Sequence, residues 1–314
     1  MQLTDTQKRL HSKIKAELGR EVMAALEDDT VIEIMLNSDG TLWIDRLGKG
    51  MEKIEKHTCS PQAAIHTIAS YLNTNITNTN PVLECNLPLD GSRFEALVPP
   101  VVTHPSFTIR KKAKKIFTLE DYIEQNILTS QQKEVIEKAI LEHQNILICG
   151  GTGSGKTTFA NAIIDKISVL SPSDRIVVIE DTAELQCKSK NNVIFRATEY
   201  ADMQRLLKST MRCRPDRILV GEVRGGEALT LLKSWNTGHP GGIATVHANS
   251  AIAALTRIEQ LVAEATIADS RSVIAEAINM VIYITKTQTG RKIAEMIRVE
   301  DFDRQNKKYL TRRL

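Results

Sequence analysis

Apolar runs and helical stretches alternate regularly from about residue 132 to the end of the chain. Runs short enough for buried strands lie at 145–149, 175–180, 217–221 and 243–247, and helical periodicity covers 133–141, 201–211 and 227–235. Two later runs, 280–285 and 292–299, have the apolar content of further strands. Strands that alternate with helices predict an α/β fold with a doubly wound sheet over 132–314.

The first part of the chain, residues 1–112, shows little of this strand-then-helix alternation. A helix is predicted over 4–26, and a shorter one after Pro61. The runs "VIEIMLN" and "TLWID" flank an Asp-Gly pair, which is a hairpin signal, and "RFEALVPP" and "SFTIR" indicate further strands. This pattern predicts a smaller α+β domain, joined to the α/β domain by a linker at 113–131.

Composition and charge exclude some classes of protein. The chain has 314 residues, 42% of them hydrophobic, which is enough for two domains with cores of their own. Lys and Arg number 41 against 38 Asp and Glu, so the net charge of +3 does not predict a nucleic-acid-binding protein. The five cysteines form no C-x-x-C pair, which argues against zinc and disulfides and favours a reducing cytosol. No stretch has the apolar length of a signal peptide or of a membrane span.

The segment "ILICGGTGSGKTTFANAI" has the pattern of a phosphate-binding loop. An apolar strand leads into Gly150-x4-Gly155-Lys156-Thr157, and a helix follows. Glycines let successive N–H groups face phosphate oxygens at the positive end of that helix. The lysine would reach the β- and γ-phosphates, and the threonine hydroxyl would bind Mg²⁺. The predicted nucleotide-binding residues are Gly150, Gly151, Thr152, Gly153, Ser154, Gly155, Lys156, Thr157 and Thr158.

Polar side chains follow three of the predicted parallel strands, at the edge where ligands of open α/β sheets collect. Glu222 is the best candidate to polarise an attacking water. Glu180 and Asp181 could hold Mg²⁺ through water or share the role of base, although either could instead cap a helix. His247 would sense the γ-phosphate or pair with Glu222, or else be structural. The polar residues at this edge of the sheet therefore predict a site that hydrolyses a triphosphate.

Four motifs in order resemble the Walker A, Asp box, Walker B and His box of the secretion-superfamily traffic ATPases. They are "GGTGSGKTT", "IEDTAELQ", "RPDRILVGEVRGGEAL" and "NTGHPGGIATVHANS", and "EIMLNSDGTLWIDR", "LPLDGSRFEALVPPVV" and "SFTIRKK" extend the resemblance through the first domain. The chain is most similar to conjugal-transfer ATPases of the TrbB type, from type IV secretion systems. The resemblance implies a RecA-like P-loop domain and a PAS-like first domain. It also implies use of ATP and Mg²⁺, and a homo-hexamer that meets other secretion components at the cytoplasmic face of the inner membrane.

The resemblance also implies functional roles for several arginines. Arg93 and Arg110 match first-domain residues that reach the γ-phosphate, although the residues alone favour a surface side chain for either. Arg212, Arg214 and Arg217 flank the second acidic motif together with Arg224, and some could act across a subunit boundary, although an exposed charge is the more usual role for any one of them. Arg224, two residues beyond Glu222, is the strongest of these four.

Other functions compete with this interpretation. A pilus-retraction or type II secretion motor belongs to the same class, but type II motors usually carry a four-cysteine zinc insert that is absent from this sequence. A DNA-translocating RecA-like ATPase and a nucleotide-dependent scaffold are further alternatives. The basic runs "RKKAKK" and "RQNKKYLTRR" could touch anionic lipid or an acidic partner, or be a solvated linker and tail. Few aromatic residues accompany them, so direct DNA binding is not expected.

Overall fold

The computed structural model describes residues 4–46, 49–112, 116–198, 200–287 and 290–314. The chain folds into two units, unit 1 (Met1–Lys114) and unit 2 (Lys115–Leu314), each with a core of its own. The boundary between the two units falls inside the segment 113–131 that was predicted as a linker. None of the described helices combines the length and the apolar character that crossing a membrane requires.

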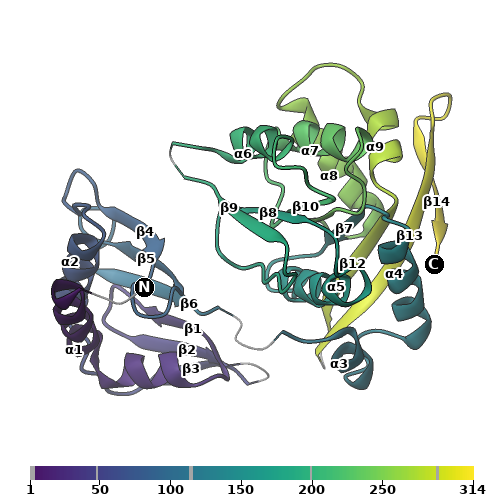
Figure 1. The fold of residues 1–314 in the computed structure, drawn as a ribbon. Helices are drawn as coiled ribbons and strands as arrows, with labels where there is room; N and C mark the ends of the chain where they lie inside the picture. Colours follow the sequence, from purple (N-terminus) through teal and green to yellow (C-terminus); the bar gives the residue numbers. More distant parts are fainter. Residues whose placement is uncertain (1–3, 47–48, 113–115, 199, 288–289) are drawn as a thin grey trace. The chain divides into compact units, whose positions relative to one another are not determined.

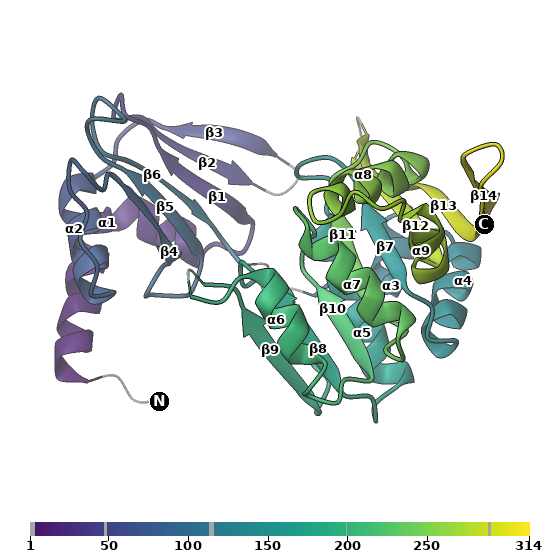
Figure 2. The same ribbon diagram turned by 90° about the horizontal axis from the view of Figure 1, so that it is seen from above.

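Unit 1 is an antiparallel sheet with two helices against one face (Figure 2). The strand order is β3-β2-β1-β6-β5-β4. The helices are α1 (Asp5–Glu27) and α2 (Pro61–Tyr71), and the strands are β1 (Val31–Leu36), β2 (Leu42–Arg46), β3 (Gly50–Ile54), β4 (Val82–Asn86), β5 (Arg93–Leu97) and β6 (Ser106–Arg110). The predicted hairpin is the β1–β2 pair, in which Leu36 faces Leu42.

Local signals explain where α1 begins and where it is interrupted. Thr4 caps the first turn in a capping box, with its hydroxyl accepting from the Gln7 amide and the Gln7 side chain accepting from the Thr4 amide. Gly19 has φ +81°, and a Cβ there would lie 2.7 Å from the Thr58 hydroxyl oxygen. Only glycine combines this conformation with this close approach.

The first basic run is partly structural. Lys111 Nζ donates to the backbone carbonyl oxygens of Ala25 (3.0 Å) and Asp28 (2.6 Å), at the C-terminal end of α1. A lysine ammonium at this place compensates the partial negative charge at the C-terminal end of a helix. This contact differs from the solvated linker that the sequence suggested. Residues 113–115 of the run lie outside the described part of the chain.

Unit 2 is built on one sheet covered by helices on both faces (Figure 1). Its strand order is β14-β13-β12-β7-β11-β10-β8-β9, with β12 to β9 parallel and the β12–β13 and β13–β14 pairs antiparallel. The strands are β7 (Ile146–Cys149), β8 (Ile176–Glu180), β9 (Asn192–Arg196), β10 (Arg217–Val220), β11 (Ile243–Val246), β12 (Met280–Thr287), β13 (Gly290–Asp303) and β14 (Lys308–Arg313). The doubly wound sheet is confirmed.

The helices of unit 2 form two layers. Those on one face are α3 (Leu119–Glu124), α4 (Ser130–Leu141) and α5 (Lys156–Leu170). Those on the other face are α6 (Met203–Thr210), α7 (Glu227–Asn236), α8 (Ala251–Ala263) and α9 (Arg271–Ala277). The four-residue strands β7, β10 and β11 are buried along their whole length, which is why they read as continuous apolar runs.

The structure differs from the sequence prediction at three segments of unit 2. Residues 113–131 were predicted as a linker, but α3 lies inside this range and buries Leu119 and Tyr122 against α5. Strand β9 was not predicted. The basic run 304–313 contains strand β14 instead of a solvated tail.

An arginine at the start of β10 is buried. Arg217 has no exposed surface, and its guanidinium donates to Asp174 (2.5 Å) and to the backbone oxygens of Ile140 (2.9 Å) and Gly241 (3.2 Å). It also donates to the Ser171 hydroxyl (3.1 Å). Arg217 therefore joins three segments to the start of β10: the end of α4, the loop 171–174 and the loop before β11. The suggestion that this arginine acts across a subunit boundary is wrong, because its donors are used inside unit 2.

Candidate functional site

The glycine loop between β7 and α5 has the backbone conformation that phosphate binding needs. Gly153 and Gly155 have φ of +66° and +96°, and Gly155 directly precedes the first turn of α5. A Cβ on Gly150 would lie 2.3 Å from the Ile284 carbonyl oxygen, whereas one on Gly151 would meet no atom within 4 Å. The loop is thus packed on one side and open on another, with the N-terminus of α5 at its end.

Lys156 lies at the mouth of this loop. The residue is only 7% exposed, and its Nζ donates to the carbonyl oxygens of Gly150 (3.1 Å) and Gly151 (3.2 Å). The same Nζ lies 3.4 Å from each ring nitrogen of His247. Its positive charge is therefore held beside the loop and next to the end of β11.

His247 joins Lys156 to Glu222. Its Nε2 lies 2.9 Å from Glu222 Oε1. If Nε2 carries the proton and donates to the carboxylate, Nδ1 is left to accept from the ammonium, which is the arrangement of a neutral imidazole. Partial burial and the neighbouring Lys156 charge lower the pKa of His247, and the Glu222 carboxylate opposes this shift. Both the contacts and the pKa favour the neutral ring at pH 7.

Arg224 extends the contacts to the Asp box. Its guanidinium donates to Glu222 Oε2 (2.6 Å) and to a carboxylate oxygen of Asp181. Glu222 is the first cause of the raised pKa of Arg224. The contact chain runs from Lys156 through His247, Glu222 and Arg224 to Asp181, and it follows the spatial order of the strands β7, β11, β10 and β8. The predicted convergence of these residues is what the fold produces, while their chemical roles stay predictions.

Glu180 differs from the other carboxylates. It is 1% exposed, and its Oε2 accepts from the amides of Glu184 and Leu185, each at 2.9 Å. Burial raises the pKa of Glu180, and these two hydrogen bonds oppose the rise. Glu180 thus holds the loop that follows β8, and its contacts are distinct from the Lys156-to-Asp181 chain.

Asn161 holds the same loop from the other side, and the sequence analysis missed it. This buried residue of α5 donates to the Glu184 carbonyl oxygen (3.0 Å) and accepts from the Gln186 amide (2.8 Å). A polar residue among apolar ones on a helix was the only signal, and its partners lie more than 20 residues away. Asn161 and Glu180 together fix the segment that begins with Asp181.

Replacing Asn161 by Ala is expected to lower the free energy of unfolding by about 1–3 kcal/mol, because two buried backbone groups lose their partner. Turnover of the nucleotide should fall as well, since Asp181 would no longer be fixed against Arg224. Chemical denaturation and phosphate release measure the two effects. Asn236→Ala is the control, because Asn236 is exposed. Equal stability of the two variants would contradict the role of Asn161 in holding the loop after β8.

The donors available for Mg²⁺ fit this ion. Thr157 lies in the first turn of α5, and Asp181 and Glu222 supply carboxylate oxygens at the same sheet edge. Mg²⁺ is usually bound by one or two carboxylates together with substrate phosphates, so a closed protein cage is not required. Within the described residues, no group of three or more His, Cys, Asp or Glu forms such a cage.

The two arginines that were predicted to reach the γ-phosphate lie in unit 1. Arg93 on β5 faces Arg110 on β6 as a direct cross-strand neighbour. Arg110 also faces Glu33 on β1, with Nε 3.8 Å from its carboxylate. The pair is thus a local concentration of positive charge on one sheet. Its role at a γ-phosphate stays a prediction.

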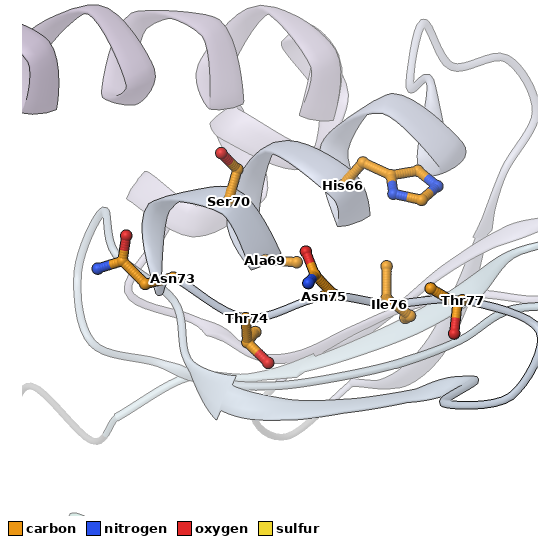
Figure 3. Close-up of a pocket in the computed structure, with 8 residues that line it drawn as sticks. All are labelled: His66, Ala69, Ser70, Asn73, Thr74, Asn75, Ile76 and Thr77. Carbon is orange, nitrogen blue, oxygen red and sulfur yellow. The ribbon is translucent and has the colours of Figure 1, made fainter.

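An open depression of about 400 Å³ on unit 1 lies outside the sequence motifs, between α2 and the segment after it, and Figure 3 shows His66 and Ser70 on the helix side. Its other lining residues are Ala69, Asn73, Thr74, Asn75, Ile76 and Thr77. This lining contains no Lys, Arg, Asp or Glu, so it offers neither the fixed charge nor the glycine loop of a triphosphate site.

Comparison with known proteins identifies relatives over nearly the whole chain. A family model described as "Type II/IV secretion system protein" matches residues 17–308. The probable conjugal transfer protein TrbB of Sinorhizobium fredii is 49% identical over 295 residues, which is 94% of this chain and 91% of the relative. The type IV secretion system protein VirB11 of Bartonella henselae is 31% identical, with 86% of this chain and 89% of the relative covered.

Solved structures share the fold at lower identity. The ATPase DotB of Legionella pneumophila aligns with a TM-score of 0.62 at 19% identity, covering 90% of this chain and 80% of its own. The pilus retraction motor PilT with bound ADP also aligns with a TM-score of 0.62, at 20% identity, covering 86% of this chain and 80% of its own. Both show that the RecA-like fold implied by the motifs is correct.

Proposed function

Because this chain belongs to the family of type II/IV secretion system proteins, we propose that its sheet-edge site hydrolyses ATP to ADP and phosphate and thereby energises a type IV secretion or conjugal transfer apparatus. The observation that carries the proposal is the contact chain from Lys156 to Glu222, at the opening of the glycine loop. The 49% identical relative, named as a probable conjugal transfer protein, supports the biological role.

The proposal gives each side chain of the site a task. Loop amides and the α5 N-terminus bind the phosphates, and Lys156 turns from the loop carbonyls to the β- and γ-phosphates. Glu222 would orient the attacking water and accept its proton, since His247 joins its carboxylate to Lys156. Neutral His247 donates to Glu222 and responds when Lys156 moves onto the nucleotide.

Mg²⁺ would be held by Thr157 and, through water, by Asp181 and Glu222. The ion would neutralise charge that develops on the phosphate oxygens. Arg224, which is paired with the carboxylates of Glu222 and Asp181, would hold Glu222 in place. Arg93 and Arg110 would supply guanidinium groups to the γ-phosphate, because a planar, always-charged donor suits a transferring phosphoryl group.

The proposal also covers the oligomeric state of the chain and its location in the cell. The chain would act as a homo-hexamer at the cytoplasmic face of the inner membrane, together with other secretion components. Light scattering on the purified chain with and without nucleotide tests the assembly, for which a mass of six chains is expected. A monomer under both conditions would contradict it.

Phosphate release from Mg·ATP by the purified chain tests the activity. We expect steady turnover that single-stranded DNA does not raise strongly. Failure to hydrolyse ATP as a hexamer would favour a scaffold in which nucleotide is only an assembly ligand. A large stimulation by DNA, with salt-dependent binding, would instead favour a DNA-translocating motor. Loss of plasmid transfer from a donor strain lacking this chain, restored by returning it, tests the biological role.

A further inference from the structure

The β12–β13 hairpin forms a wall along the glycine loop. The Ile284 carbonyl lies where a Cβ of Gly150 would be, and the Lys286 ammonium lies 2.9 Å from a Cβ position on Gly153. A Cβ on Gly155 would lie 3.1 Å from Arg291 Cδ. Three glycines of the loop thus approach one hairpin, and two of these approaches involve cationic side chains.

Arg291 makes the most specific of these contacts. Its Nη2 donates to the Gly153 carbonyl oxygen at 3.5 Å, a long hydrogen bond. Its Nε is buried and has no hydrogen-bond partner among the described residues. The guanidinium also lies close enough to Tyr122 of α3 for its charge to oppose the rise of the tyrosine pKa that burial causes. Arg291 therefore lies against the glycine loop with donor capacity to spare.

A donor on a loop carbonyl affects the amide on the other side of the same peptide. The Gly153 carbonyl shares its peptide plane with the Ser154 N–H, so fixing the oxygen fixes the direction of that N–H. Amides of such a loop bind phosphate only when they point inward. Positive charge a few ångströms behind the loop also favours an anionic ligand in front of it.

We propose that Arg291 is a positioning residue of the nucleotide site, which holds the Gly153 peptide so that the loop amides face the phosphates, with Lys286 adding positive charge behind the loop. This inference rests on the proposed function, since it concerns the same phosphates, but it assigns residues that the four sequence motifs do not contain. Arg291 contributes mainly to ground-state binding of the polyphosphate and little to the chemical step.

The test is nucleotide affinity, measured on the full chain with a fluorescent ADP analogue. Arg291→Met should raise Kd about tenfold, as expected for loss of one hydrogen bond from a charged donor. KM for ATP should rise similarly while kcat stays near the wild-type value. Arg291→Lys should recover part of the affinity, and added salt should weaken wild-type binding more than binding by Arg291→Met. A merely structural residue would not give this salt difference.

Lys292→Met is the matched control, because Lys292 is exposed and adjacent strand residues point to opposite faces. An Arg291→Met chain with wild-type Kd, or a Kd raised equally in Lys292→Met, would overturn the proposal. If the wild type binds ADP without hydrolysing ATP, the proposed function fails while this comparison still stands. If the wild type binds no nucleotide, amide hydrogen exchange over residues 150–156 tests whether Arg291 holds the Gly153 peptide. Arg291→Met should then exchange faster than the wild type in this segment, and an equal rate would overturn the proposal.

Discussion

Glu222→Gln is expected to lower kcat for ATP hydrolysis by about 10²–10⁴-fold, the usual range for loss of a positioned general base. Glutamine keeps the size of the side chain and an oxygen that can accept from Arg224, so the contacts around it should largely persist. The amide cannot take a proton from water at neutral pH. Nucleotide affinity should therefore change far less than turnover.

Phosphate release and binding of a fluorescent ADP analogue measure these two quantities on the same preparation. Glu134→Gln is the control, because Glu134 is exposed on α4 and lies outside the contact chain. Turnover by Glu222→Gln close to that of the control would remove Glu222 from the role of base. Asp181→Asn would then be the next variant to measure.

Arg217→Met is expected to destabilise unit 2 by about 3–5 kcal/mol, the cost of breaking a buried ion pair by removing one partner. Methionine leaves Asp174, whose side chain is 14% exposed, without its guanidinium, and it removes one donor from each of two backbone oxygens. The double variant Arg217→Met with Asp174→Leu should lose less stability than the single one, because no carboxylate then remains unpaired.

Urea unfolding followed by Trp235 fluorescence measures this effect. Trp235 is buried in unit 2 and donates to the Ile218 carbonyl next to Arg217, while Trp43 belongs to unit 1 and is changed to Phe in all the chains compared. Arg212→Met is the control, since Arg212 is exposed. A loss below about 1 kcal/mol, the value typical of surface pairs, would contradict a structural role for the buried guanidinium.

Much of the fold could be predicted because its signals are local. The Asp39-Gly40 pair gave the β1–β2 hairpin, and continuous apolar runs gave the buried strands β7, β8, β10 and β11. The gathering of Lys156, Glu222 and His247 was also predictable, because neighbouring parallel strands end at one sheet edge.

The missed elements have weaker local signals. Strand β14 is an edge strand, and such strands carry the charged residues that otherwise indicate a tail. Helix α3 spans only Leu119–Glu124, too few residues for a clear period.

The side chains whose roles the sequence did not predict have roles that depend on tertiary contacts. An arginine is usually a surface charge, and Arg217 is buried because three surrounding segments supply acceptors for its guanidinium. Asn161 acts on a loop beyond the next strand. Arg291 meets Gly153 across more than 130 residues, and no sequence spacing encodes that approach.

The central claim is that the glycine loop and Lys156 work on a triphosphate together with the carboxylates at the same sheet edge. Steady-state phosphate release by the wild type and by Lys156→Ala, in the same buffer with Mg·ATP, tests it most directly. We expect turnover by the wild type and a rate at the no-enzyme background for Lys156→Ala. Hydrolysis by Lys156→Ala at the wild-type rate would contradict the account.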